Sequence, residues 1–295
     1  MLDMNRPEAF KAMTSEQRLI EQITELPSLP AVAARSLRHP TAGSPSIEFL
    51  SGIIEDDSEF ASRFLEIVNS AYYGLPSEVR SVRDAVVILG VEVSQSLAIA
   101  ATVTTRLWVL DETFDAADFW RHSLARGLFA EIIANRVNLP GPHSAFVLGL
   151  LQDVGQIAML QAIPDRCHEI ELQAAELRIY RWRAEQQTLR FTHADVGARL
   201  AEKWNLCKEF CEAIRWHHQP EKSSVGTQHA LVLQLADAMT NASYPALSRE
   251  YVTTPLYRGL WEPLGLDEPA ARAIYDTRYF VEERSHAFFE NILWS

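Results

Sequence analysis

The sequence predicts an all-α protein, built as a multi-helix bundle in two lobes. Apolar residues recur at helical spacing along most of the 295-residue chain, and no segment alternates apolar and polar residues between hairpin turns. The breaks between the apolar runs carry residues typical of helix ends, such as serine, aspartate, glycine and proline. At 47% hydrophobic and 22% charged residues, the composition is that of a globular protein with a substantial core.

The first lobe is predicted over residues 1–112. Serine or aspartate stands where three successive helices would begin, and Gly74 and Gly90 suit helix ends. The candidate N-caps are Ser46, Asp57 or Ser58, and Ser81. The stretch 91–108 is rich in β-branched residues, which allows a strand, but its length favours a helix. The helices predicted in this lobe cover residues 14–26, 31–38, 46–57, 58–74, 81–90 and 91–108.

A polar break at residues 111–118, DETFDAAD, separates this lobe from a second one. We predict the second lobe over residues 113–245 and a helical extension over residues 246–295. Pro164 bounds a central helix because proline cannot continue one. The helices predicted in these two parts cover residues 118–137, 146–160, 165–183, 192–206, 208–220, 229–242 and 277–294.

The central helix, FVLGLLQDVGQIAML, is apolar on nearly all sides, which is typical of a buried helix. It nevertheless carries Asp153, and a buried carboxylate is costly unless it is paired or bound to a metal ion. Histidines and a second carboxylate elsewhere in the chain could supply partners, namely His122, His193, His217, His218 and Asp237. Imidazole and carboxylate groups suit zinc, iron or manganese, so these residues are candidate ligands of a divalent ion.

Each candidate also has a purely structural interpretation. His193 follows Thr192 and could belong to a helix cap, and Asp153 could be hydrogen-bonded within a packed core. Protonated histidine is favoured at a helix C-terminus, which suits His217 and His218. His122 and Asp237 could likewise serve only in packing and hydrogen bonding.

The order H…(H)D…H…HH…D resembles the HD superfamily of metal-dependent phosphohydrolases. More closely, the chain resembles the HDOD domain, the HD-related output domain of bacterial signalling proteins, over roughly residues 20–240. The combination of NSAYYG with SVRDAVVILG is the most specific part, since the catalytic HD relatives lack that N-terminal lobe. The other matching segments are LPSLPAVA, FWRHSLA, FVLGLLQDVG, HADVGARLAEKW and AIRWHHQP. The resemblance implies that Asp153 faces His122 and Asp237 across a shared cleft.

Two departures from the active relatives bear on function. Where those enzymes read His-Asp and Gly-Lys, this chain reads Gln152-Asp153 and Gly155-Gln156. One histidine donor is absent, because neutral glutamine is a poor ligand for a transition ion, and the lysine beside a substrate phosphate is absent too. The resemblance therefore implies a largely non-catalytic, regulatory domain with a degenerate metal site.

Three functions remain open. The first is a signalling module that acts through contacts with other proteins or through a ligand in the degenerate cleft. The second is a metal-dependent phosphohydrolase or cyclic-dinucleotide phosphodiesterase that works with the remaining ligands. The third is a scaffold in which the polar cluster only fixes packing. Glutamine at residue 152 favours the first function over the second.

Charge and cysteine content exclude several other classes. The net charge of −12 argues against a nucleic-acid binder that relies on general phosphate attraction, and against a polybasic membrane-surface protein. The N-terminus lacks the apolar core of a signal peptide, and no run of about 18 apolar residues suggests a membrane span. Three cysteines do not make a disulfide framework, and Cys207 and Cys211 suit a buried pair better than half a zinc site. We expect a cytoplasmic bacterial protein whose partners are other signalling proteins, with a homodimer also open.

Overall fold

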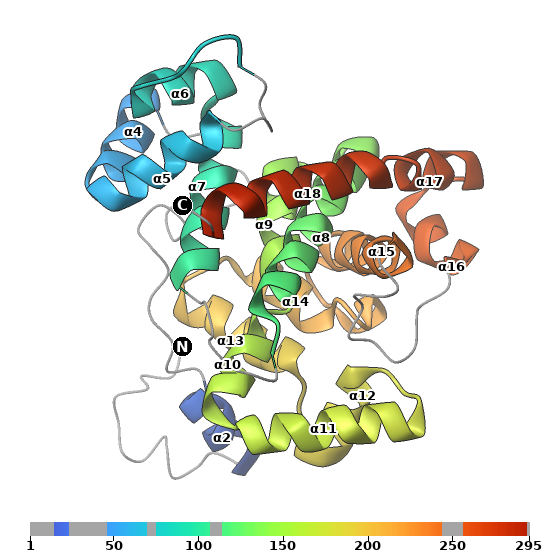
Figure 1. Ribbon diagram of the computed structural model, residues 1–295. Helices are drawn as coiled ribbons and strands as arrows, with labels where there is room; N and C mark the ends of the chain where they lie inside the picture. Colours follow the sequence, from blue (N-terminus) through green and yellow to red (C-terminus); the bar gives the residue numbers. More distant parts are fainter. Residues whose placement is uncertain (1–14, 24–45, 70–74, 107–113, 244–255, 294–295) are drawn as a thin grey trace.

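The computed structural model describes residues 15–23, 46–69, 75–106, 114–243 and 256–293, and every regular element in these ranges is a helix (Figure 1). The predicted all-α class is therefore confirmed. Helices α4 to α7 form one group, and a larger group extends from α8 onward. The predicted boundaries near residues 112 and 245, and the predicted helix 31–38, lie outside the described residues and stay predictions.

The first group of helices begins at the caps that the sequence predicts. Ser46, Asp57 and Ser81 each accept a hydrogen bond from the backbone N–H three residues further on, at 3.2, 3.1 and 3.0 Å. Gly90 ends the third helix with φ of 83°, in the left-handed region that favours glycine. The group consists of α4 (Ile47–Glu55), α5 (Ser58–Val68), α6 (Val82–Leu89) and α7 (Val91–Arg106).

Helix α5 ends at Val68, earlier than the predicted end at Gly74. Asn69 gives the physical reason. Its side-chain amide donates a hydrogen bond to the Val79 carbonyl and accepts one from the Val79 N–H, each at 2.7 Å. Asparagine readily offers the backbone such an alternative to helix, so Asn69 fastens the end of α5 to the segment that leads into α6.

The second group contains the candidate site. Gly127 of α8 and Gly149 of α9 let these two helices touch backbone to backbone, since a Cβ on either glycine would lie 2.8 Å from a backbone atom of the other helix. The group consists of α8 (Ala116–Arg136), α9 (Pro142–Leu151), α10 (Val154–Ala162), α11 (Pro164–Leu177), α12 (Arg181–Leu189), α13 (His193–Lys203), α14 (Lys208–Trp216), η1 (Pro220–Lys222), α15 (Thr227–Ser243), α16 (Arg258–Trp261), η2 (Glu262–Leu264), α17 (Glu268–Tyr275) and α18 (Arg278–Leu293).

Two helices that the sequence predicts as continuous are each divided, so those two predictions are wrong. The central helix breaks into α9 and α10 at Asp153, whose φ of −101° and ψ of 8° leave the helical region. The helix predicted over 165–183 breaks into α11 and α12 at Arg178, which has φ of 48°. Apolar spacing indicates which residues are buried. It gives no sign of a single residue whose φ and ψ angles depart from those of a helix.

Two helices join parts of the chain that are far apart in sequence. Helix α2 (Ser15–Ile23) packs on α10 and α13, where Glu21 forms ion pairs with Arg199 and Lys203. It thus lies with the second group although it precedes the first in sequence. Helix α18 packs on both α8 and α5 and so connects the two groups (Figure 1).

In the part of the chain that the structure describes, one stretch is long and apolar enough to cross a membrane. It runs over Pro142–Ala162, which includes α9 and α10, and 89% of its apolar window is buried inside the protein. Burial of this kind is typical of the core helix of a folded domain.

Candidate metal centre

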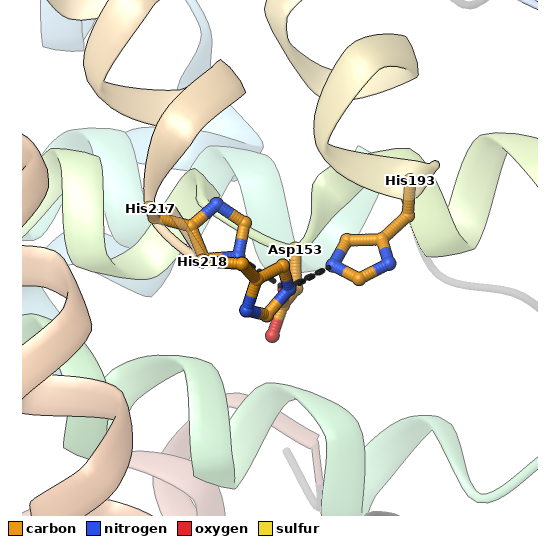
Figure 2. A group of neighbouring side chains, drawn as sticks. All are labelled: Asp153, His193, His217 and His218. Atoms are coloured by element: carbon orange, nitrogen blue, oxygen red, sulfur yellow. Dashed lines mark hydrogen bonds and ion pairs between the residues drawn. The ribbon is translucent and has the colours of Figure 1, made fainter. Parts of the chain in front are cut away.

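Four of the six candidate ligands meet at one place. Asp153, His193, His217 and His218 offer ligand atoms that all lie within 4.8 Å of one another (Figure 2). The first three are buried and His218 is partly exposed. One carboxylate and three imidazoles are a donor set that suits zinc, iron or manganese. We refer to these four residues as the Asp–His cluster.

Each member of the cluster lies at the end of a helix. Asp153 occupies the break between α9 and α10, and His217 follows the last residue of α14. His193 is the first residue of α13, which begins at the Thr192 cap that the sequence predicts. Thr192 and Asp195 form a reciprocal capping box there, and its two hydrogen bonds hold the first turn of α13, to which His193 belongs. Three helix ends therefore converge on one point.

A glycine makes this convergence possible. A Cβ on Gly155, in the first turn of α10, would lie 2.0 Å from the carbonyl oxygen of His193 and 2.8 Å from the backbone nitrogen of Gly197. Real Cβ atoms do not approach backbone atoms so closely. Glycine at this position therefore allows α10 and α13 to pack backbone to backbone, which brings His193 to Asp153.

The Asp153 carboxylate lies among the imidazole nitrogens. Its Oδ1 is 3.1 Å from Nε2 of His193 and 3.5 Å from Nε2 of His217. Nε2 of His218 is 3.0 Å from Nε2 of His193. Two neutral imidazoles cannot both point lone pairs at each other at this distance, so a proton or a metal ion must lie between acceptor atoms here.

The outer nitrogens of two cluster histidines are held by hydrogen bonds. Nδ1 of His193 is 2.7 Å from the Glu185 carboxylate, which also accepts the backbone N–H of His193 at 2.8 Å. Nδ1 of His217 is 2.7 Å from the carbonyl oxygen of Ile214. Because carboxylates and carbonyls only accept, each Nδ1 carries the proton and each Nε2 is directed to the cluster. Metal-ligating histidines are usually oriented in this way.

The electrostatics of the cluster favour a positive charge at its centre. Burial alone would lower the pKa of His193, but the carboxylates of Glu185 and Asp153 outweigh it and raise that pKa to about 10. Burial would raise the pKa of Glu185, but His193 and Arg181 bring it down to about 2. Burial and the neighbouring histidines hold the pKa of His218 well below its usual range. In the absence of a metal ion, a proton on His193 therefore supplies the central positive charge.

Metal binding is expected to release that proton. A ligating Nε2 of His193 must be unprotonated, and its pKa of about 10 means that the free protein carries the proton at pH 7. The apparent affinity should thus rise with pH, by about tenfold per unit while one proton is lost. Titration calorimetry at pH 7 in two buffers of different ionisation enthalpy should show about one proton released per ion. Binding heats that do not depend on the buffer would contradict His193 as a ligand.

Buried polar atoms near the cluster test whether a metal ion fits. The side-chain nitrogen and oxygen of Gln152 are buried and have no hydrogen-bond partner among the described residues, and the same holds for Nε2 of His217. Such orphaned atoms are costly in a dry core and are typical of sites that take an ion or water. The cluster therefore fits a divalent ion held by Asp153 and the three histidines.

The other two candidate ligands lie outside the cluster. Nδ1 of His122 donates to the carbonyl oxygen of Asp118 at 2.9 Å, one turn back on α8. Asp237 of α15 is linked to Asp153 through Arg126, which pairs with both carboxylates. Whether His122 and Asp237 ligate an ion stays a prediction.

Arg126 and Glu185 are the important site residues that the sequence analysis missed. Arg126 follows His122 by one helical turn, so its place on the same face of α8 was a usable signal. Glu185 stands four residues after Arg181, with which it pairs at 3.0 Å. That spacing is common on exposed helix surfaces, and nothing in the sequence marks this pair as buried.

An all-α fold with a buried Asp–His cluster defines a helical domain of the HD type. The chain belongs to the HDOD domain family, which its sequence matches over residues 26–220. It is also 24% identical over 200 residues to an uncharacterised protein of Treponema pallidum. That match covers 68% of this chain but 38% of the relative, so the chain spans well under half of that protein's length.

Solved structures show the same fold. An HDOD domain protein of unknown function from Geobacter sulfurreducens is 21% identical, with a TM-score of 0.79 over 94% of this chain and 97% of that one. A candidate phosphohydrolase from Shewanella amazonensis is 23% identical, with a TM-score of 0.72 over 93% and 97%. A candidate signal transduction protein from Marinobacter aquaeolei is 22% identical, with a TM-score of 0.77 over 97% and 64%.

Proposed function

We propose that this chain is a regulatory domain of bacterial signal transduction, which holds a divalent ion at the Asp–His cluster and does not hydrolyse phosphoesters. The observation that carries the proposal is Gln152. It is fully buried beside Asp153 and puts a neutral amide where active relatives have a ligand histidine. Gln156, 8% exposed, puts a second neutral amide where they have a lysine that contacts phosphate.

The donor set supports a structural role for the ion. A bound ion of this kind can polarise a phosphoryl oxygen and generate hydroxide near neutral pH. Catalytic zinc sites usually use three protein ligands and keep a position open, whereas four protein ligands are typical of closed structural sites. Asp153 and the three histidines together supply four donors. The cluster therefore suits a closed site that couples metal occupancy to the packing of α10, α13 and α14.

The expected result of an activity assay follows from these features. Metal-loaded protein should not hydrolyse cyclic dinucleotides, nucleotides or generic phosphodiesters above background with manganese, iron or zinc added. Metal analysis of protein purified without chelator should find a divalent ion, and Asp153→Asn should lose it. Turnover that disappears in Asp153→Asn but persists in the surface variant Glu78→Gln would overturn the regulatory assignment.

Substitution of Gln152 by histidine is expected to raise metal affinity by at least about tenfold. The change returns an imidazole to a buried position next to Asp153. Loss of even a group that only hydrogen-bonds to a metal ligand typically lowers metal affinity roughly 10–100-fold. Gln156→Lys is the matched control, because it adds a cation and no ligand. A metal titration should separate the two variants. Unchanged metal content in Gln152→His, together with a lower melting temperature, would favour a hydrogen-bonded scaffold over a metal site.

A residual metal-dependent phosphohydrolase is the second candidate function. It is supported by the four remaining donors and by the likeness in fold to the Shewanella amazonensis protein. The phosphodiesterase assay with the Asp153→Asn and Glu78→Gln variants distinguishes this second function from the regulatory one.

We also propose that the domain works in the cytoplasm through contacts with other signalling proteins or with a second copy of itself. The net charge of −12 supports protein partners over nucleic acid or an anionic membrane surface. Light scattering at increasing protein concentration would test directly whether two copies associate. A molecular mass of one chain at every concentration would rule out such a homodimer.

A further inference from the structure

Arg126 occupies an unusual position beside the Asp–His cluster. It lies on α8 with its side chain 10% exposed, between two carboxylates that come from different helices. Its Nη1 is 3.0 Å from Oδ2 of Asp153, and its Nε is 2.7 Å from Oδ1 of Asp237. A single guanidinium thus bridges two acidic residues that the sequence singled out as metal ligands.

The two oxygens of Asp153 face different partners. Oδ1 lies toward His193 and His217, at 3.1 and 3.5 Å, whereas Oδ2 lies toward Arg126. In a site with two metal ions, a bridging carboxylate would give one oxygen to each ion. Here Arg126 stands on the side where the second ion would be held.

The guanidinium is a permanent charge. Arginine stays protonated in proteins, and its planar fork suits carboxylates. A divalent ion brought to Oδ2 of Asp153 and Oδ1 of Asp237 would therefore have to displace Arg126 or lie against it, and like charges repel strongly at a site with little water. Asp237 also accepts a hydrogen bond from Asn241 at 3.2 Å, which further fixes its carboxylate.

We infer that Arg126 takes the place of a second metal ion, so that the Asp–His cluster holds one ion and Asp237 serves as the partner of Arg126 rather than as a ligand. This inference rests on the proposed function, because it assumes that the cluster binds an ion. Arg126 acts as a positioning residue and sets the stoichiometry of the site. His122 lies one helical turn before Arg126 on α8, so the two residues share one face of that helix.

Manganese titration with electron paramagnetic resonance tests the inference. The native protein should bind one Mn²⁺ per chain and give the spectrum of an isolated ion. Arg126→Met keeps a long side chain but removes the charge, so it should bind two ions with a spin-coupled spectrum. Arg126→Lys keeps the charge and should bind one, and Arg126→Met combined with Asp237→Asn should return to one. Two ions in the native protein, or one in Arg126→Met, would overturn the inference and leave metal binding intact.

A second variant keeps the test decisive if Arg126→Met does not fold. Asp237→Asn should leave Mn²⁺ affinity within about twofold of native, whereas a ligand role for Asp237 would lower it at least about tenfold. Such a loss would refute the inference alone. Absence of binding in the native protein and in every variant would instead refute the proposed function, and the inference with it.

Discussion

Glu185→Gln is expected to lower the free energy of unfolding of the metal-free protein by about 3 kcal/mol. Glu185 is fully buried and accepts from the ring and the backbone of His193 while it pairs with Arg181. Removing one partner of a buried ion pair leaves an uncompensated charge, which typically costs 3–5 kcal/mol. We expect the lower end of that range because His193 can release its proton.

The pH dependence of this effect has a definite sign. The pKa of Glu185 falls from 4.5 to about 2 on folding, so its contribution is present above pH 4.5 and is lost as pH falls toward 2. The pKa of His193 rises from 6.5 to about 10, so its contribution is complete below pH 6.5 and is lost as pH rises through 10. The difference between native and variant should thus be largest between pH 4.5 and 6.5.

Urea unfolding in the presence of a chelator would measure this difference. Glu171→Gln is the matched control, since Glu171 pairs with the same Arg181 but its side chain is 25% exposed. Its cost should be smaller than that of Glu185→Gln, because the Glu171 carboxylate is partly exposed to water. Equal losses in the two variants would show that the Glu185–His193 contact contributes nothing specific.

Gly155→Ala is expected to destabilise the protein by about 3 kcal/mol and to lower metal affinity by at least about tenfold. The added Cβ would overlap the carbonyl oxygen of His193, so α10 and α13 must move apart. His193 would then be displaced from Asp153. Thermal unfolding and metal titration of the same variant would record both effects.

The same substitution elsewhere in the chain should act in the opposite direction. Gly52 lies within α4, and nothing stands within 4 Å of a Cβ built there. Alanine is favoured over glycine in a helix interior by up to about 1 kcal/mol, so Gly52→Ala should stabilise the protein. Destabilisation by both substitutions would mean that close packing at Gly155 is not the cause.

The sequence predicted the helices well wherever a cap or an apolar stripe marked them. Ser46, Asp57, Ser81 and Thr192 all cap helices as expected, because N-caps depend on local hydrogen bonds that the sequence displays directly. The break at Asp153 could not be predicted in the same way. It depends on how α9 and α10 pack on distant helices, which is information that a local pattern does not contain.

The residues of the Asp–His cluster could be predicted from the sequence, but the ion pairs around it could not. Burial of Asp153 among apolar residues indicated that it needs partners, and His193, His217 and His218 lie around it. No pattern in the sequence connects Asp237 with Arg126, which stands 111 positions away. Long-range ion pairs of this kind depend on the tertiary structure and produce no periodic pattern in the sequence.

Helix α18 has a consequence for how the chain acquires its structure. It packs on α5, although more than two thirds of the chain separates the two helices, and on α8. During synthesis the amino-terminal part emerges first, and closing so long a loop is entropically costly. The face of α5 that α18 contacts is therefore covered only after α18 has been synthesised. We expect refolding to proceed through an intermediate in which α8 to α15 are already packed and α5 still exposes the face that α18 will occupy.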